Sequence, residues 1–226
     1  MSGSGEGVAE SGPTTAGERP PQRTGARLWN MLDRPAVWSA SRIVLDAAFG
    51  VYRKRREVLE EWGVLAGGPS ILDIGCGIGQ FAALAEGDYL GIDLNEHYIR
   101  HAKRRHGDSG RAFRAMDVRD LLAEDHTYDV VVMVDFLHHL DDDACLALLS
   151  AARRLARHHV ASFEPITEQT NPAGRWIVTH DRGAHVRPLA DLYGLMDQAG
   201  LRRLKEAPVS LGPIGTRAVL AAPPSA

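Results

Sequence analysis

The chain has 226 residues, of which 44% are apolar and 24% charged, and its formal net charge is −3. That composition can fill one complete core, and it lacks the basic excess expected of a protein that binds duplex nucleic acid. No run reaches the ~18 apolar residues of a membrane span and the first residues lack the order of a secretory signal, so we expect a cytoplasmic domain that binds no membrane.

The first 66 residues predict a tail followed by helices. Residues 1–26 are rich in Gly, Ser, Glu and Pro, and we expect them to be disordered. Residues 27–66 carry apolar side chains at helical spacing, interrupted at Pro35 and Gly50, which predicts two or three helices that form a cap. The basic run 53–56 is interpreted as a solvated helix face, with a phosphate or nucleic-acid patch as the alternative.

A glycine-rich segment follows the first predicted strand. The apolar run 71–74, interrupted by Asp73, ends in Gly75, Gly77 and Gly79. Bare backbone at these positions lets a ligand approach closely, and we expect a helix of about eight residues to begin there with its free N–H groups toward the ligand. A dinucleotide fingerprint needs a third glycine where Gln80 or Ala82 stands, so that reading fits only in part.

Three further strands each end close to an acid. The segment 88–93 ends in Asp93, which is suited to accept the hydroxyl groups of a ribose. The segment 112–116 is followed by Asp117. The segment 128–134 shows no polar alternation, which indicates a strand covered on both faces, and it is followed by residues 135–140, Asp-Phe-Leu-His-His-Leu.

The remaining residues predict a helix over 143–156, a strand over 159–163 and a long insertion over 166–187. A helix follows from Leu189 to its cap at Gly200. Residues 201–209 and 216–222 are expected to pair as antiparallel strands around a turn. The alternation of strands and helices predicts an α/β fold.

The segment Asp73-x-Gly75-x-Gly77-x-Gly79 resembles motif I of the class I S-adenosylmethionine-dependent methyltransferases. Asp93, Asp117 and residues 135–140 follow it in the order found in that family. The resemblance implies a Rossmann-like, seven-stranded, mostly parallel sheet with an antiparallel edge hairpin and helices on both faces. It places the methyltransferase domain at residues 67–226, behind an N-terminal helical cap at 27–66.

The resemblance also implies S-adenosylmethionine as the cofactor and a set of residues that bind it. Leu94 is expected to lie flat against the purine, and Asp117 to accept from the exocyclic amine of adenine. The expected cofactor-binding residues are Asp73, Gly75, Cys76, Gly77, Gly79, Asp93, Leu94, Asp117, Val118, Asp135 and Phe136.

Candidates for the reaction lie after the fourth and fifth strands and in the insertion. His139, His138 and Glu164 are the candidate catalytic residues, although each could instead hold a loop or shape the cofactor pocket. Arg182, His185 and Arg187 are candidates for binding an anionic or carbonyl-bearing acceptor. We expect no metal site, because His97 and His101 lack a third ligand.

The acceptor is expected to be a small organic molecule, because the chain lacks several motifs of enzymes that act on macromolecules. Residues 135–138 read Asp-Phe-Leu-His where base amino methyltransferases carry Asn/Asp-Pro-Pro-Tyr. Three alternatives stay open: a macromolecular methyltransferase, a cofactor-binding module without turnover, and a nicotinamide oxidoreductase. The sequence leaves the acceptor and the oligomeric state undetermined.

Overall fold

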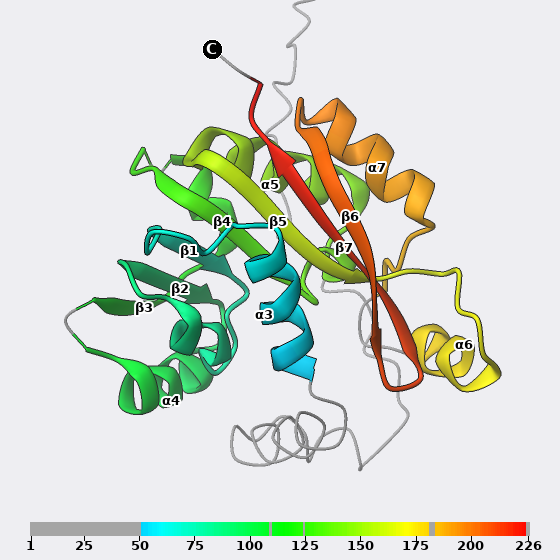
Figure 1. The fold of residues 1–226 in the computed structure, drawn as a ribbon, viewed down its shortest axis with the longest axis horizontal. Helices are drawn as coiled ribbons and strands as arrows, with labels where there is room; N and C mark the ends of the chain where they lie inside the picture. Colours follow the sequence, from blue (N-terminus) through cyan, green and yellow to red (C-terminus); the bar gives the residue numbers. More distant parts are fainter. Residues whose placement is uncertain (1–50, 109, 124, 181–183, 225–226) are drawn as a thin grey trace, which may run out of the picture.

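The computed structural model describes residues 51–224 apart from 109, 124 and 181–183. Seven strands form one sheet in the order β3-β2-β1-β4-β5-β7-β6, as Figure 1 shows. The strands are β1 (Ile71–Ile74), β2 (Tyr89–Asp93), β3 (Arg111–Ala115), β4 (Tyr128–Val134), β5 (Ala156–Pro165), β6 (Arg202–Leu211) and β7 (Ile214–Ala222). The first five are parallel, and β7 pairs antiparallel with both β5 and β6, so the predicted sheet is confirmed.

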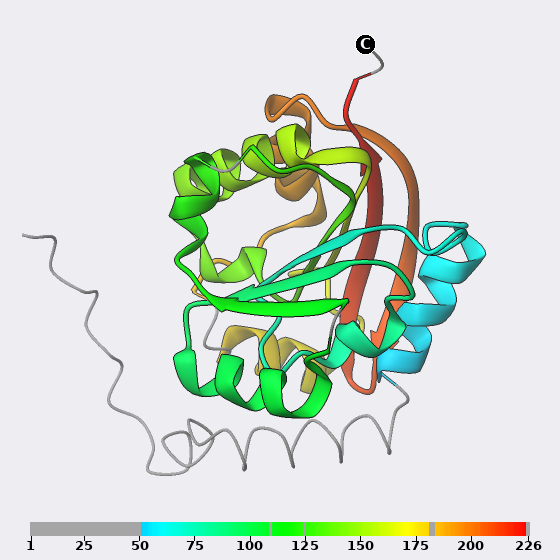
Figure 2. The same ribbon diagram turned by 90° about the vertical axis from the view of Figure 1, so that its left-hand side faces the viewer.

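Helices cover both faces of the sheet (Figure 2). On one face, α5 (Asp142–Leu155), α7 (Leu189–Gln198) and the 3₁₀ helix η2 (Val118–Ala123) share a core with the sheet. On the other face, α3 (Val51–Glu61), α4 (Glu96–His106) and the 3₁₀ helix η1 (Gln80–Leu84) do the same. A parallel sheet with both faces covered directs its functional loops to the carboxyl edge of the strands.

Side-chain caps fix where the helices beside that edge begin. Asn95 accepts hydrogen bonds from the N–H groups of His97 and Tyr98 and begins α4 directly after β2. Asp141 accepts from the N–H of Ala144 and begins α5. Each cap satisfies N–H groups that would otherwise lack a partner, so the loop before each helix has a defined length.

The prediction of an eight-residue helix after the glycine segment was wrong, because the chain forms only η1, of five residues. It must turn back to β2 at Gly87, where a Cβ atom would lie 2.2 Å from the carbonyl oxygen of Gly68. A further helix was missed in the insertion: α6 (Pro172–Thr179), capped by Asn171, lies beside the β6–β7 hairpin.

The predicted N-terminal cap is described in part. Its third helical stretch forms α3, whereas the expected tail and the first two stretches lie outside the described residues. Arg55 corrects the interpretation of the basic run, because its side chain is completely buried rather than solvated. Within the described residues no helix is long and apolar enough to cross a membrane, and no group of three potential metal ligands occurs.

Candidate functional site

The glycine loop after β1 opens onto a cavity at the carboxyl edge of the sheet. Gly75, Gly77 and Gly79 have φ values of 75°, 55° and 78°, which is the left-handed region that side chains disfavour. A Cβ atom on Gly77 would meet nothing within 4 Å, and Gly77 lines the cavity. A side chain there would project into space that a ligand can use.

Two cavities of about 550 and 250 Å³ lie along this edge. Both are lined by Gly75, Asp93, Phe136 and His139, so they meet at these residues. The larger one is bounded mainly by apolar residues of the loops after β2, β3 and β4 and by α5. The smaller one extends from the glycine loop to α3 and is bounded by more polar side chains. The two together form an elongated site with one apolar and one polar part.

Asp93 is held at the junction by backbone donors. Its Oδ2 accepts from the N–H of Gly77 at 3.0 Å, and its Oδ1 accepts from the N–H of Asn95 at 2.8 Å. Burial raises the pKa of this carboxyl group, and the two backbone hydrogen bonds oppose that shift. Each oxygen keeps a further lone pair for a ligand, which suits the ribose-binding role predicted for Asp93.

Asp73 and Cys76 lie deeper, on the wall of the smaller cavity. The Tyr89 hydroxyl donates to Oδ2 of Asp73 at 2.5 Å, and burial raises the pKa of Asp73 to about 7. Burial also raises the pKa of the Cys76 thiol well above its usual value, and the charges of Asp73 and Asp93 add to this effect. Cys76 and Cys145 are both free thiols.

The predicted adenine contacts lie in the larger cavity. Leu94 is 73% exposed and lines this cavity together with Val118 and Asp117. Asp117 accepts from Nε and Nη2 of Arg119 at 3.0 and 2.5 Å, and also from the Arg119 backbone N–H. These hydrogen bonds lower the pKa of Asp117 to about 2. Asp117 is therefore a carboxylate at the rim of the cavity, already oriented by Arg119.

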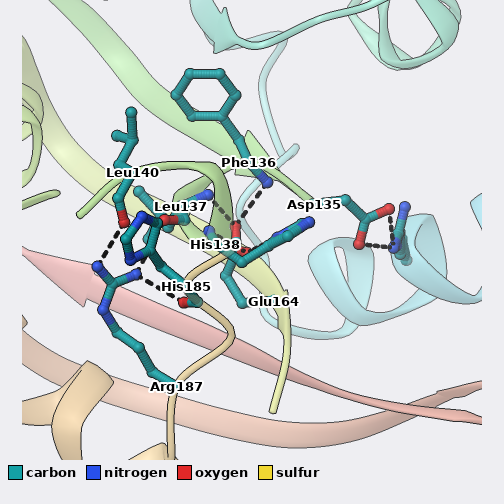
Figure 3. A network of polar contacts seen from close by, with 9 residues as sticks. Asp135, Phe136, Leu137, His138, Leu140, Glu164, His185 and Arg187 are labelled. Atoms are coloured by element: carbon teal, nitrogen blue, oxygen red, sulfur yellow. Dashed lines mark hydrogen bonds and ion pairs between the residues drawn. The ribbon is translucent and has the colours of Figure 1, made fainter. Parts of the chain in front are cut away.

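The loop after β4, residues 135–140, is held by buried charged groups (Figure 3). Glu164 accepts from the N–H groups of Phe136, Leu137 and His138 at 2.9, 2.9 and 3.3 Å, and it lies 2.8 Å from Nδ1 of His138. These contacts occupy its carboxylate, which is 3% exposed. Of the two readings left open for Glu164, they support the one in which it holds the loop.

Arg187 holds carbonyl oxygens of the same loop (Figure 3). Its Nη1 donates to the carbonyl oxygens of Leu137 and His185, its Nη2 to that of Leu140, and its Nε to Asp142. The guanidinium is therefore engaged with the chain itself. The backbone N–H of the exposed His185 donates to the carbonyl of His138, and Arg182 lies outside the described residues.

His139 differs from its neighbour His138. Its side chain is exposed and lines both cavities, whereas His138 is 5% exposed and contacts Glu164. Of the three candidate catalytic residues, His139 is the one that lies at the junction of the two cavities. His138 and Glu164 lie behind it, as part of the support for the loop.

The sequence predicted helices that form a cap, but not which residues of α3 contact the site. Tyr52 donates from its hydroxyl group to Oε1 of Gln80, and both line the smaller cavity. Arg55, one turn along α3, donates from Nη2 to both carboxylate oxygens of Asp135 at 2.7 Å. The sequence does carry a signal for these contacts. Tyr52, Arg55 and Leu59 are spaced so that they fall on one helix face, and the apolar Leu59 indicates that this face is buried.

Part of the chain is similar to known methyltransferases. Residues 71–159 match a family model described as a methyltransferase domain. A phthiotriol/phenolphthiotriol dimycocerosates methyltransferase of Mycobacterium tuberculosis is 35% identical over 77 residues, which are 32% of this chain and 28% of the relative. The chain thus matches less than a third of the length of this curated relative.

Two solved structures resemble the fold. Magnesium protoporphyrin IX methyltransferase of Synechocystis PCC 6803, with bound S-adenosylhomocysteine, has a TM-score of 0.61 at 19% identity and covers 76% of this chain and 85% of its own. The [4+2]-cyclase SpnF has a TM-score of 0.62 at 16% identity and covers 76% and 82%. At these identities the likeness concerns the fold, which a methyltransferase and a cyclase share.

Proposed function

We propose, from the class I methyltransferase fold of its residues 71–159, that this chain transfers a methyl group from S-adenosylmethionine to a small organic acceptor. The observation that carries the proposal is the open backbone at Gly77, which lines the smaller cavity beside Asp93. Asp93 is one of the residues at which the two cavities meet. A nucleoside joined to an amino acid has an apolar base at one end and polar groups at the other, which matches this elongated site.

The residues present fit such a ligand. In our assignment the larger cavity takes the adenine between Leu94, Met116 and Val118, with Asp117 at its rim. Asp93 binds the ribose. The glycine loop and Asp73 bind the amino-acid end in the smaller cavity.

When bound, S-adenosylmethionine supplies an activated methyl group: a lone pair of the acceptor forms the new bond to carbon, and the electron pair of the broken carbon–sulfur bond stays on sulfur. The contribution of the protein to such a displacement is mainly alignment, which is worth up to ~7–11 kcal/mol in ideal intramolecular cases. We assign His139 to accept a proton from acceptors that arrive protonated, because it is exposed at the junction of the cavities.

A second candidate is a protein of this fold that binds the cofactor without transferring its methyl group. One observation favours it: SpnF, which shares the fold, is a [4+2]-cyclase, so proteins with this fold are not confined to methyl transfer. The acceptor class is likewise part of our proposal. It is supported by the lack of an Asn/Asp-Pro-Pro-Tyr segment at residues 135–138 and by the small-molecule names of the methyltransferases that resemble the chain.

Calorimetry and a labelled-methyl assay test the proposal in two steps. We expect S-adenosylhomocysteine to bind the full chain and NAD not to bind. Labelled S-adenosylmethionine, incubated with the chain and a panel of small acceptors, should then lose its methyl label to a product. Binding without label transfer would favour the second candidate, and absence of binding would contradict both.

A further inference from the structure

Arg55 differs from the other basic residues of its helix. Arg53 and Arg56 form surface ion pairs with Glu57 and Glu60 on the next turn. The Arg55 side chain is 0% exposed and donates from Nη2 to both oxygens of Asp135 at 2.7 Å. Burying a guanidinium is costly unless it is paired, so this contact links α3 to the end of β4.

Asp135 faces the smaller cavity in an unusual backbone conformation. Its φ is 51°, and among the described residues it is the single non-glycine residue with a positive φ. Such a conformation costs about 1–3 kcal/mol and persists where the surroundings enforce it. Its carboxylate is 21% exposed and Asp135 lines the cavity. The backbone N–H of Asp135 donates to the carbonyl oxygen of Phe163, and the ion pair with Arg55 holds its carboxylate at this wall.

The smaller cavity is acidic. Asp73, Asp93 and Asp135 all line it, and none of the described residues that line it is lysine or arginine. Asp73 accepts from a tyrosine hydroxyl and Asp93 from backbone N–H groups, which are neutral donors. Arg55 thus carries a full positive charge. It does not line the cavity itself but forms an ion pair with Asp135, which does.

We propose that Arg55 sets how strongly the site prefers S-adenosylmethionine over S-adenosylhomocysteine, acting through Asp135 as a positioning residue and counter-charge. This inference rests on the proposed function. The two ligands differ by one methyl group and one positive charge on sulfur. The positive charge of Arg55 offsets the charge of Asp135, and its removal makes this wall more negative by one charge, which favours the sulfonium cation in particular. By neutralising Asp135, Arg55 keeps substrate binding from becoming too tight relative to product binding.

Four proteins test this, because among them the Arg55–Asp135 position carries three different net charges. The wild type and the double variant Arg55→Met/Asp135→Asn are neutral at this position, Arg55→Met is negative, and Asp135→Asn is positive. We expect the ratio of the S-adenosylmethionine affinity to the S-adenosylhomocysteine affinity to rise roughly five- to tenfold in Arg55→Met. It should fall by a similar factor in Asp135→Asn and return to within about twofold of wild type in the double variant.

The affinities are measured by calorimetry on the full chain at one fixed pH. Arg56→Met, on the same helix but at the surface, is the matched control and should leave the ratio unchanged. Since breaking a buried pair can unfold a protein, Arg55→Gln, whose amide can still donate to Asp135, replaces Arg55→Met if that variant does not fold, and its ratio should also rise. Arg55→Lys keeps the charge and should keep the wild-type ratio.

The possible outcomes separate this inference from the proposed function. If neither ligand binds the wild type, the proposed function fails. If both bind and the ratio follows the order of charges, Arg55 has the role assigned here. Equal losses of both affinities in the single variants, with the ratio unchanged, would overturn the inference, because Arg55 would then only support the fold.

Discussion

Gly77 is the residue on which the open wall of the smaller cavity depends. Gly77→Ala should cost about 1–2 kcal/mol of folding free energy, because φ is 55° there. It should also weaken S-adenosylhomocysteine binding by about tenfold or more, the equivalent of at least ~1.4 kcal/mol. Gly194→Ala, in α7 with nothing within 4 Å of its Cβ, is the control and should leave binding unchanged. Calorimetry and urea unfolding measure both effects, and unchanged binding in Gly77→Ala would contradict the assignment.

Asp73 makes folding stability depend on pH in an unusual direction. Burial raises its folded-state pKa to about 7 from 3.8, so between these values the folded state holds a proton that the unfolded state has lost. The stabilising contribution is complete below about pH 4 and is lost as the pH rises to 7. We expect Asp73→Asn to gain up to about 4 kcal/mol relative to wild type over this interval. Urea unfolding of both proteins from pH 4.5 to 8 measures the difference, and a constant difference would contradict it.

His139 is exposed, so its substitution should separate chemistry from stability. We expect His139→Ala to lower kcat by about 10²- to 10⁴-fold for acceptors that must lose a proton. The free energy of unfolding should stay within ±0.5 kcal/mol. His158→Ala, an exposed histidine in β5, is the control. An unchanged kcat with such acceptors would remove His139 from the reaction.

At the scale of elements, the loop after β4 depends on Glu164 of β5, which accepts three backbone N–H groups. Glu164→Gln should lower the free energy of unfolding by about 1–3 kcal/mol, since buried donors lose a charged acceptor. The pH profile of kcat should keep its shape. Glu206→Gln, on the exposed surface of β6, should have little effect. Normal stability together with a shifted pH profile would return Glu164 to the list of catalytic residues.

The element boundaries show what the sequence could and could not predict. The continuous valine and methionine run predicted β4 at its observed bounds. An Asn-Pro pair is typical of a turn, but Asn171 and Pro172 serve as the cap and first residue of α6. The spacing of Phe81, Leu84 and Ala85 favoured a full helix, but the contact between Gly87 and Gly68 ends it early. Contacts between distant residues decided both cases, and a single sequence does not show them.

At the scale of the molecule, the resemblance to class I methyltransferases implied the seven-stranded, mostly parallel sheet with its antiparallel edge hairpin, whereas the order of the strands comes from the structure. The helical cap was also expected, but the burial of Arg55 was not. Arg55 lies in a basic run that predicts a solvated face, whereas its side chain packs against Phe163 and donates to Asp135. Likewise, the engagement of Arg187 by four acceptors becomes visible once the insertion is folded against the loop after β4.

The effect of ligand binding on hydrogen exchange should therefore extend to α3. Tyr52 contacts Gln80 across the smaller cavity, so a ligand held there should slow hydrogen exchange in α3 as well as in the glycine loop. The helix α6 is the internal control, because Asn171 at its start is bonded to the β6–β7 turn, away from both cavities. Mass spectrometry with and without S-adenosylhomocysteine measures this. Equal exchange in α3 in both states would show that the helix does not close the site.

The raised pKa of the Cys76 thiol affects how readily this side chain could be methylated. Sulfur in its anionic form is a strong nucleophile, and this one lines the space proposed to hold a reactive alkylating agent. With its pKa raised by burial and by two neighbouring acids, it keeps its proton at neutral pH. Under the proposed function, a thiol that keeps its proton is a poor nucleophile toward the methyl donor, and we expect Cys76 to stay unmethylated.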